Sequence, residues 1–217
     1  MPIDPRRIRY EDDDLLIVSK LSRELVVRGK GEMQKLPLLD FLKKQYPTLT
    51  ALHRLDFETS GLVAFAKKRS VLGSVRDASF EGWEKTYESL VIGRPSKSGE
   101  IRHPLPARSG ERDVPALTKF RVLRQFKDCA HVEATIQSGR HHQIRRHFAY
   151  LHSPLICDDI YGDPKANRTF GKKLHIRHFF LHASKLKFPH PVTGKMIEVA
   201  DPLPKSFTVA LETLARL

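Results

Sequence analysis

Cysteine, tryptophan and methionine are scarce in this sequence of 217 residues, which contains 2 Cys, 1 Trp and 3 Met. A small secreted domain held together by disulfides would carry more cysteines, so the composition argues against that class. The first residues lack the apolar core of a secretory signal peptide. The apolar runs are also too short to span a bilayer. We therefore expect a cytoplasmic protein with no membrane segment.

Internal repeats and low-complexity segments are also absent. What remains is an ordinary globular composition with 40% hydrophobic residues, which excludes disorder of the whole chain. The length suits one large domain or two small ones. We predict one domain over residues 1–217, and a monomer.

Acidic residues are in short supply relative to basic ones. Lys and Arg together number 38 against 25 Asp and Glu, which gives a net charge of +13. A soluble chain this basic usually binds a polyanion, and nucleic acid is the first candidate. A solvated basic surface without a partner is the plain alternative. Binding to a membrane surface is a third, although no basic amphipathic helix stands out.

The hydrophobic patterns predict an α+β fold with a mixed, mostly antiparallel sheet and flanking helices, because runs of strands are interrupted by isolated helices. The predicted strands are two within residues 7–20 around an acidic turn, then 62–67, 85–92, 117–124, 131–136 and 179–188. The predicted helices are 36–46, one capped by Ser70 with Leu72, Val75 and Ser79 on one side, 142–151 and 206–217. Residues 94–114 and 163–173 are rich in Gly, Pro and charge and predict loops.

A carboxylate at the start of a buried strand marks the first candidate site. Asp56 lies two residues after Arg54 and before the polar turn 59–61, and an apolar run follows at once. An Asp in this position is usually a turn or cap residue when it stands alone. The residues around Asp56, together with three further segments, decide between a turn residue and a catalytic one. The segments that attract attention are HRLDFETSGL (53–62), KTYESLVIG (85–93), SGRHHQIRRH (138–147) with PLICDDIYG (154–162), and LHASKL (181–186).

These segments closely resemble, in the same order, the motifs of the RluA family of pseudouridine synthases. The family patterns are H-R-L-D-x-x-T-S-G-L, K-x-Y-x-A-L-V-x-G, T-G-R-x-H-Q-I-R-x-H with P-I-x-G-D-x-x-Y-G, and L-H-A-x-x-L-x-F. One short motif would be weak evidence, whereas four in register are strong. The resemblance spans about residues 8–204. It implies the pseudouridine synthase fold, with a catalytic cleft across the sheet. By this resemblance residues 1–217 are expected to be a single catalytic domain, without the N-terminal S4 RNA-binding domain that several family members carry.

The resemblance also implies roles for individual residues. Asp56 matches the catalytic aspartate, and Arg145 matches an arginine that pairs with it. Tyr87 matches a catalytic tyrosine that stacks beneath the target base, with a role in proton transfer as a second option. Arg54 matches an arginine that takes part in flipping the nucleotide, and Ile144 and Leu181 match apolar positions around the base. Basic residues that we expect to contact RNA include Arg140 and Arg146; further candidates are Lys67, Lys68, Arg69, Lys172, Lys173 and Arg177.

The chemistry agrees with these roles. A base stacked in an RNA helix must be extruded before its ring can be turned. An Asp56 carboxylate screened from water needs a guanidinium close by to stay ionised, which a bidentate pair with Arg145 would provide. An aromatic floor holds a flipped pyrimidine by stacking. No cofactor or metal is needed for this isomerisation. Asp56 either attacks C1′ or abstracts the C2′ proton, and the sequence leaves both open.

The sequence departs from the family pattern at a few positions. Residues 20–23 read Lys-Leu-Ser-Arg where K-P-x-G is typical, so we expect that loop to differ. Cys157 stands where glycine is usual, and we expect a small buried residue there and no nucleophile. The run 143–147 with 162–163 and 167–168 is most similar to the tRNA pseudouridine synthase C branch, which favours tRNA over 23S rRNA as substrate.

Two rivals from other classes stay open. One is a non-catalytic RNA-binding protein of the same fold, although binding alone does not need a carboxylate near phosphates. The other is a metal-dependent hydrolase using Asp56 and histidines, for which no Cys pair or H-E-x-x-H pattern is present. Among the histidines, His53 and His182 are interpreted as structural.

Overall fold

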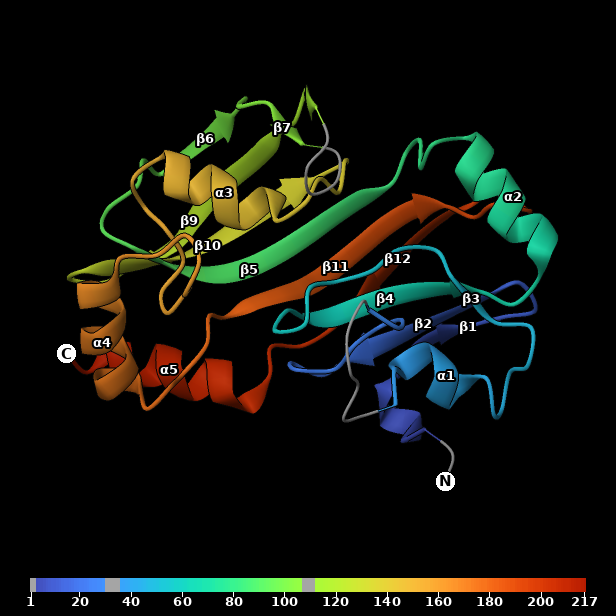
Figure 1. Ribbon diagram of the computed structural model, residues 1–217, viewed down its shortest axis with the longest axis horizontal. Helices are drawn as coiled ribbons and strands as arrows, with labels where there is room; N and C mark the ends of the chain where they lie inside the picture. The colour runs from blue at the N-terminus through green and yellow to red at the C-terminus, as the bar shows by residue number, and fades with distance from the viewer. Residues whose placement is uncertain (1–2, 30–35, 107–111) are drawn as a thin grey trace. The chain divides into compact units, whose positions relative to one another are not determined.

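The computed structural model describes residues 3–29, 36–106 and 112–217, and it confirms the α+β class (Figure 1). The chain divides into two compact units. The first consists of Met1–Glu84 and Ala183–Asp201, and the second of Lys85–His182 and Pro202–Leu217. The expectation of one domain over the whole chain stays a prediction. None of the helices within the described residues is long and apolar enough to cross a membrane.

The first unit is built on strands that are buried on both faces. Its elements are η1 (Pro5–Arg7), β1 (Ile8–Glu11), β2 (Leu15–Lys20), α1 (Leu38–Leu42), β3 (Thr50–Ala51), β4 (Ser60–Ala66), α2 (Arg69–Asp77), most of β11 (Leu181–Pro189) and β12 (Met196–Ala200). The antiparallel pairs are β1–β2, β2–β4, β3–β4 and β11–β12, and β11 is the neighbour of β4. Every residue of β2 and of β4 is buried, which explains their continuous apolar runs.

The second unit is an antiparallel sheet with three helices. Its elements are β5 (Glu84–Ile92, all but its first residue), β6 (Ser98–Ile101), β7 (Leu105–Pro106), β8 (Asp113–Val114), β9 (Thr118–Gln125), β10 (Cys129–Ile136), α3 (Gln143–Tyr150), α4 (Pro164–Leu174) and α5 (Lys205–Ala215). The strand order is β5-β10-β9-β6, and β7 pairs with β8. Helix α3 lies against β9, while α4 and α5 lie beside each other (Figure 1).

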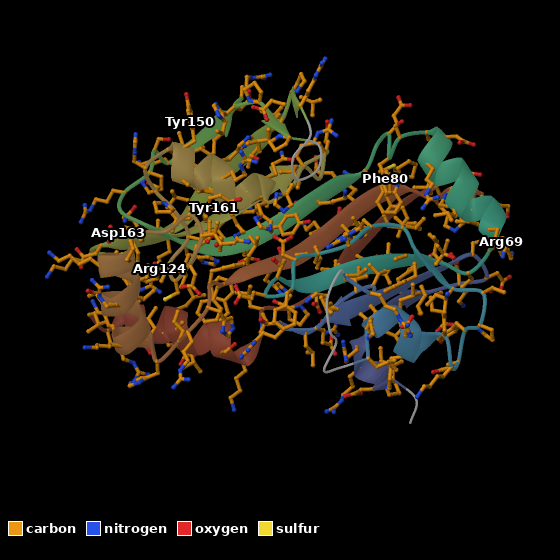
Figure 2. The ribbon with its side chains drawn as sticks, in the orientation of Figure 1. Arg69, Phe80, Arg124, Tyr150, Tyr161 and Asp163 are labelled. Carbon is orange, nitrogen blue, oxygen red and sulfur yellow. The ribbon has the colours of Figure 1, made fainter. Side chains whose placement is uncertain are left out.

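Two predictions of local structure were wrong. The segment predicted as a loop over residues 163–173 contains α4 (Pro164–Leu174), with Asp163 as its N-cap. Asp163 accepts a hydrogen bond from the backbone N–H of Ala166, and Pro164 occupies the first turn, which together are a standard helix start. Figure 2 labels Asp163 where this helix begins. Ser70 does not cap α2, because the helix begins at Arg69 with no side-chain cap.

The segment predicted as a loop over residues 94–114 is organised in part. Strands β6, β7 and β8 lie within it, and residues 107–111 fall outside the described part of the chain. The remaining strand and helix predictions are confirmed, with boundaries shifted by a few residues. In α2 the buried face consists of Val71 and Val75, so the face was predicted only in part.

Candidate active site

Asp56 lies on the loop between β3 and β4 in the first unit. Its side chain is half-buried, and its backbone carbonyl accepts a hydrogen bond from the N–H of Thr59 at 3.2 Å, which closes a tight turn. Gly61 follows with φ of 107°, a conformation that L side chains rarely adopt. The carboxylate therefore stands just before β4, at the position that the sequence predicts.

The backbone around Asp56 is held by the end of β2. The ammonium of Lys20, which is fully buried, donates hydrogen bonds to the carbonyls of Leu21 at 2.8 Å and Phe57 at 3.0 Å. The carbonyl of Phe57 also accepts a bond from the N–H of Arg23 at 2.7 Å. Burial lowers the pKa of Lys20 to about 8, although the nearby carboxylates of Glu24 and Asp56 raise it. Sequence reasoning missed this clamp, since attention fell on the absent proline and glycine.

Arg23 explains how the loop keeps its shape without that glycine. Its φ is 64°, in the left-handed region that glycine favours. Ser22, one residue earlier, donates from its hydroxyl to the carbonyl of Glu58 at 2.7 Å. This loop therefore differs from the family pattern in its side chains. Its backbone at Arg23 still has the conformation that glycine favours.

In the second unit, Arg145 forms a buried ion pair with Asp158. Its Nε and Nη2 donate to the two carboxylate oxygens at 2.7 and 2.8 Å, and both side chains are at most 5% exposed. The guanidinium also lies over the rings of Phe179 and Tyr161, at 4.4 and 5.1 Å from their centroids. Asp56 and Arg145 belong to different units, and their pairing stays a prediction.

Asp158 is the functional partner that sequence reasoning missed. The signal was present in the sequence, because Asp158 occupies the D position of the family pattern P-I-x-G-D-x-x-Y-G. Burial alone would raise its pKa, but hydrogen bonds from Arg145 and from the N–H groups of Tyr161 and Ile160 hold the pKa below its usual value. Asp158 is therefore ionised at neutral pH and fixes Arg145 in one orientation.

Gln143 organises the loop before α3. Its Oε1 accepts from the hydroxyl of Ser138 at 2.8 Å and from the N–H of Arg140 at 3.1 Å. Its Nε2 donates to the carbonyl of Leu117 at 2.9 Å. The Nε of Arg140 is buried with no hydrogen-bond partner among the described residues. This loop presents Arg140 in a fixed position.

The other predicted site residues differ in exposure. Tyr87 on β5 is 7% exposed and lies opposite Ala134 of β10. Ile144 on α3 and Leu181 at the start of β11 are buried, as expected for apolar residues around a base. Arg146 is half-buried and Arg54 is exposed. The contact of these residues with RNA stays a prediction.

A family model described as RNA pseudouridylate synthase matches residues 14–150, which is more than half of the chain. The chain belongs to the RluA family of RNA pseudouridine synthases. It is thus an isomerase that converts uridine to pseudouridine in RNA.

Relatives of this RluA-family chain point to ribosomal RNA enzymes. It is 36% identical to ribosomal large subunit pseudouridine synthase C of Salmonella typhi, over 95% of this chain and 69% of the relative. It is 31% identical to synthase D of Pasteurella multocida, over 97% of this chain and 71% of the relative. The solved structure of human RNA pseudouridylate synthase domain containing 4 shares the fold, with a TM-score of 0.79 at 22% identity over 97% of this chain and 94% of that one.

Two further groups in this RluA-family chain have structural explanations. Burial raises the pKa of the Cys157 thiol to about 11, so it is protonated at neutral pH and is a poor nucleophile, as expected.

Within the described residues, three potential metal ligands meet at Asp12, Asp14 and His190. The Nδ1 of His190 accepts from backbone N–H groups, so Nε2 carries the proton and donates to Asp12 at 3.0 Å. The hydrogen bond between His190 and Asp12 therefore belongs to the structure of the turn over residues 190–193.

His53 is structural, as the sequence analysis expected. Its Nε2 accepts a hydrogen bond from the backbone N–H of Ala64 at 3.2 Å, and its ring meets the edge of Trp83 with 6.4 Å between centroids. The imidazole thereby connects the loop that carries Asp56 to β4. His182 is 1% exposed, which agrees with a structural role.

Proposed function

We propose that this chain isomerises a specific uridine of large-subunit ribosomal RNA, with Asp56 as the catalytic carboxylate. The observation that carries the proposal is the Asp56 loop, in which the family's H-R-L-D-x-x-T-S-G-L sequence is held by three hydrogen bonds from residues 20–23 to the carbonyls of Phe57 and Glu58. A loop fixed on both sides positions its carboxylate with little conformational freedom, as a catalytic group requires.

The reaction exchanges one bond for another with no net oxidation or reduction. The N1–C1′ bond breaks, the detached base turns, and a C5–C1′ bond forms as C5 loses its proton to N1 by way of solvent or protein groups. Asp56 acts on the ribose, at C1′ or at the C2′ proton. Tyr87 supplies a stacking surface for the flipped base, and Arg145 balances the Asp56 charge. Supporting contacts with the RNA are assigned to Arg54, Arg140, Ile144, Arg146 and Leu181.

The tRNA preference inferred from residues 143–168 has no support among the relatives. The relatives compared above are named ribosomal large subunit pseudouridine synthases C and D. We therefore choose ribosomal over transfer RNA as the proposed substrate. Pseudouridine mapping of total RNA from a deletion strain and its parent identifies the target nucleotide directly. Loss of a tRNA site alone would overturn the choice of rRNA.

Asp56→Asn tests the catalytic assignment. The amide keeps the shape of the side chain but cannot carry the negative charge, so isomerisation should fall below detection while RNA affinity stays within about threefold of wild type. Tritium release from [5-³H]uridine-labelled large-subunit rRNA transcript measures turnover, and filter binding measures affinity.

A matched control is Asp77→Asn, which removes an exposed carboxylate from α2 in the same unit. It should leave both quantities unchanged. Normal turnover by Asp56→Asn would refute the assignment. RNA binding without turnover by the wild type on every rRNA and tRNA transcript would favour the non-catalytic RNA-binding protein.

A further inference from the structure

A basic pocket of about 530 Å³ opens beside α4 in the second unit. It lies between α4, the loop that carries Asp158, and the turn that follows the helix. Its lining includes Arg168, Lys172, Arg177, Cys157, Asp159 and Asn167. The family model ends at residue 150, so this whole lining lies beyond the segment that the model matches.

Three cations line the pocket and are not neutralised by the fold. Arg168, Lys172 and Arg177 are exposed, and none of them has an ion pair or side-chain hydrogen bond within the described residues. By contrast, other basic residues such as Arg121 and Lys68 are paired with carboxylates. Asp159 is the one acidic residue of the lining, which leaves the pocket with a net charge of about +2.

Stabilisation of the helix accounts for only part of this arrangement. Lys172 lies in the last turn of α4, where a cation favourably meets the helix dipole. Arg168 is in the middle of the helix and Arg177 lies beyond its end, so the dipole explains neither. Arg168 and Lys172 are four residues apart and share a helix face, separated by roughly 6 Å along the axis. Such a row suits an extended anion more than a single small one.

The pocket wall is connected to the buried Arg145–Asp158 pair through Asn167. The amide Oδ1 accepts from the N–H of Cys157 at 2.8 Å, and Nδ2 donates to the carbonyl of Asp158 at 2.9 Å. Gly162 approaches the same amide so closely that an added Cβ would lie 2.8 Å from Nδ2. A ligand in the pocket would therefore bind to a surface that is rigidly joined to Arg145.

We propose that this pocket binds backbone phosphates of the substrate RNA, at a position outside the nucleotide that is isomerised. The inference rests on the proposed function, because RNA is the polyanion that such an enzyme handles. The three cations would contribute affinity and register, and not the chemical step, since phosphate contacts position a protein on nucleic acid without reading bases.

The test compares two triple variants of the full chain. The pocket variant carries Arg168→Gln, Lys172→Gln and Arg177→Gln. The control carries Lys43→Gln, Lys44→Gln and Arg76→Gln, which removes the same charge from exposed positions in the first unit. The probe is a large-subunit rRNA transcript, with Kd measured by filter binding at several salt concentrations. The melting temperature verifies that both variants are folded.

We expect the pocket variant to lose about 2 to 3 from the magnitude of the slope of log Kd against log salt, at roughly 0.7–0.9 per phosphate contact. Its Kd at physiological salt should rise at least tenfold, while kcat at saturating RNA stays unchanged. The control should lose less than half as much slope. Equal losses in both variants, or no loss in the pocket variant, would overturn the inference.

Two outcomes separate this inference from the proposed function. If the wild type binds the transcript but does not isomerise it, the proposed function fails and the slopes still judge the pocket. If millimolar inorganic pyrophosphate raises the melting temperature of the wild type but not of the pocket variant, while both bind RNA equally, the pocket is a small-anion site and the inference is wrong.

Discussion

Two residues in this chain occupy backbone conformations that the family fills with glycine. Arg23 has φ of 64° and Cys157 has φ of 60°. A side chain in the left-handed region costs roughly 1–2 kcal/mol relative to an unstrained backbone. Both residues lie next to the proposed chemistry, one beside the Asp56 loop and the other preceding Asp158. At both positions the backbone has the left-handed conformation, although the chain has Arg23 and Cys157 where the family pattern has glycine.

Arg23→Gly should stabilise the protein by up to about 1 kcal/mol, because the backbone strain is relieved. The exposed side chain gives up only the contact of its guanidinium with the Phe57 ring, 5.9 Å from the centroid. Cys157→Gly relieves the same strain but removes a buried thiol from the core around α4, so its gain should be smaller or negative. Urea unfolding of both variants measures the difference. A stabilisation by Cys157→Gly that exceeds that by Arg23→Gly would contradict this account.

Breaking the buried ion pair between Arg145 and Asp158 should reduce the free energy of unfolding strongly. Arg145→Ala leaves a buried carboxylate without its counter-charge, which should reduce the free energy of unfolding by about 3–5 kcal/mol. It should also impair turnover, since Asp158 orients the group assigned to the reaction. Arg146→Ala, at the next position but half-buried, is the control and should cost less than about 1 kcal/mol. Similar unfolding energies for the two variants would show that the pair contributes little.

At the scale of elements, the long apolar strands were predictable, whereas the short strands β3, β6, β7, β8 and β12 and the helix α4 were not. The apolar runs of β2 and β4 and the alternation in β10 reflect burial, which sequence patterns report directly. Helix α4 was missed because Gly, Pro and charged residues dominate its sequence, while its start depends on two residues, Asp163 and Pro164. Asp56 was found from its motif. Asp158 also lies in a motif stretch, but its pairing with Arg145 depends on how α3 packs against the loop that follows it.

Gly61 shows how one element constrains the next. A Cβ at this position would lie 2.4 Å from the carbonyl oxygen of Ala183 on β11, and φ is 107°. Gly61→Ala should therefore destabilise by more than about 2 kcal/mol, by steric overlap and backbone strain together. Gly73→Ala within α2 meets nothing within 4 Å and should instead stabilise by up to about 1 kcal/mol. Thermal unfolding compares the two, and equal shifts would refute the packing argument.

At the scale of the whole molecule, the excess of basic charge is partly placed inside the protein. Lys20 and Lys85 are buried, and burial lowers the pKa of each to about 8. Carrying a charge there is unfavourable at neutral pH, so burying these two lysines reduces stability. Lys20 nevertheless holds the Asp56 loop by its hydrogen bond to the carbonyl of Phe57. Arg145 is buried as well, but it is paired with Asp158. Three cations of the basic pocket beside α4 are instead exposed, and they have no ion pair within the described residues. Composition predicted the polyanionic partner, but only the fold separates these two classes of lysine and arginine.

The buried lysines predict an unusual dependence of stability on pH. Between pH 8 and the ordinary lysine pKa of 10.5, the unfolded chain binds more protons than the folded one, so the free energy of unfolding rises with pH. Each lysine contributes at most about 1.4 kcal/mol per pH unit. Above pH 9 the thiols of Cys129 and Cys157 oppose the rise, because burial raises the pKa of the first to about 12 and of the second to about 11.

Stability should therefore increase from pH 8 to pH 9 and level off above it. Urea unfolding at half-unit steps measures the curve. Lys20→Gln keeps a donor for the carbonyl of Phe57 but removes the titrating group, so the rise should be reduced by about half. Arg54→Gln, an exposed change near the same loop, should leave the rise intact. A flat profile in the wild type, or an undiminished rise in Lys20→Gln, would mean that Lys20 is not held in a low-dielectric environment beside Asp56.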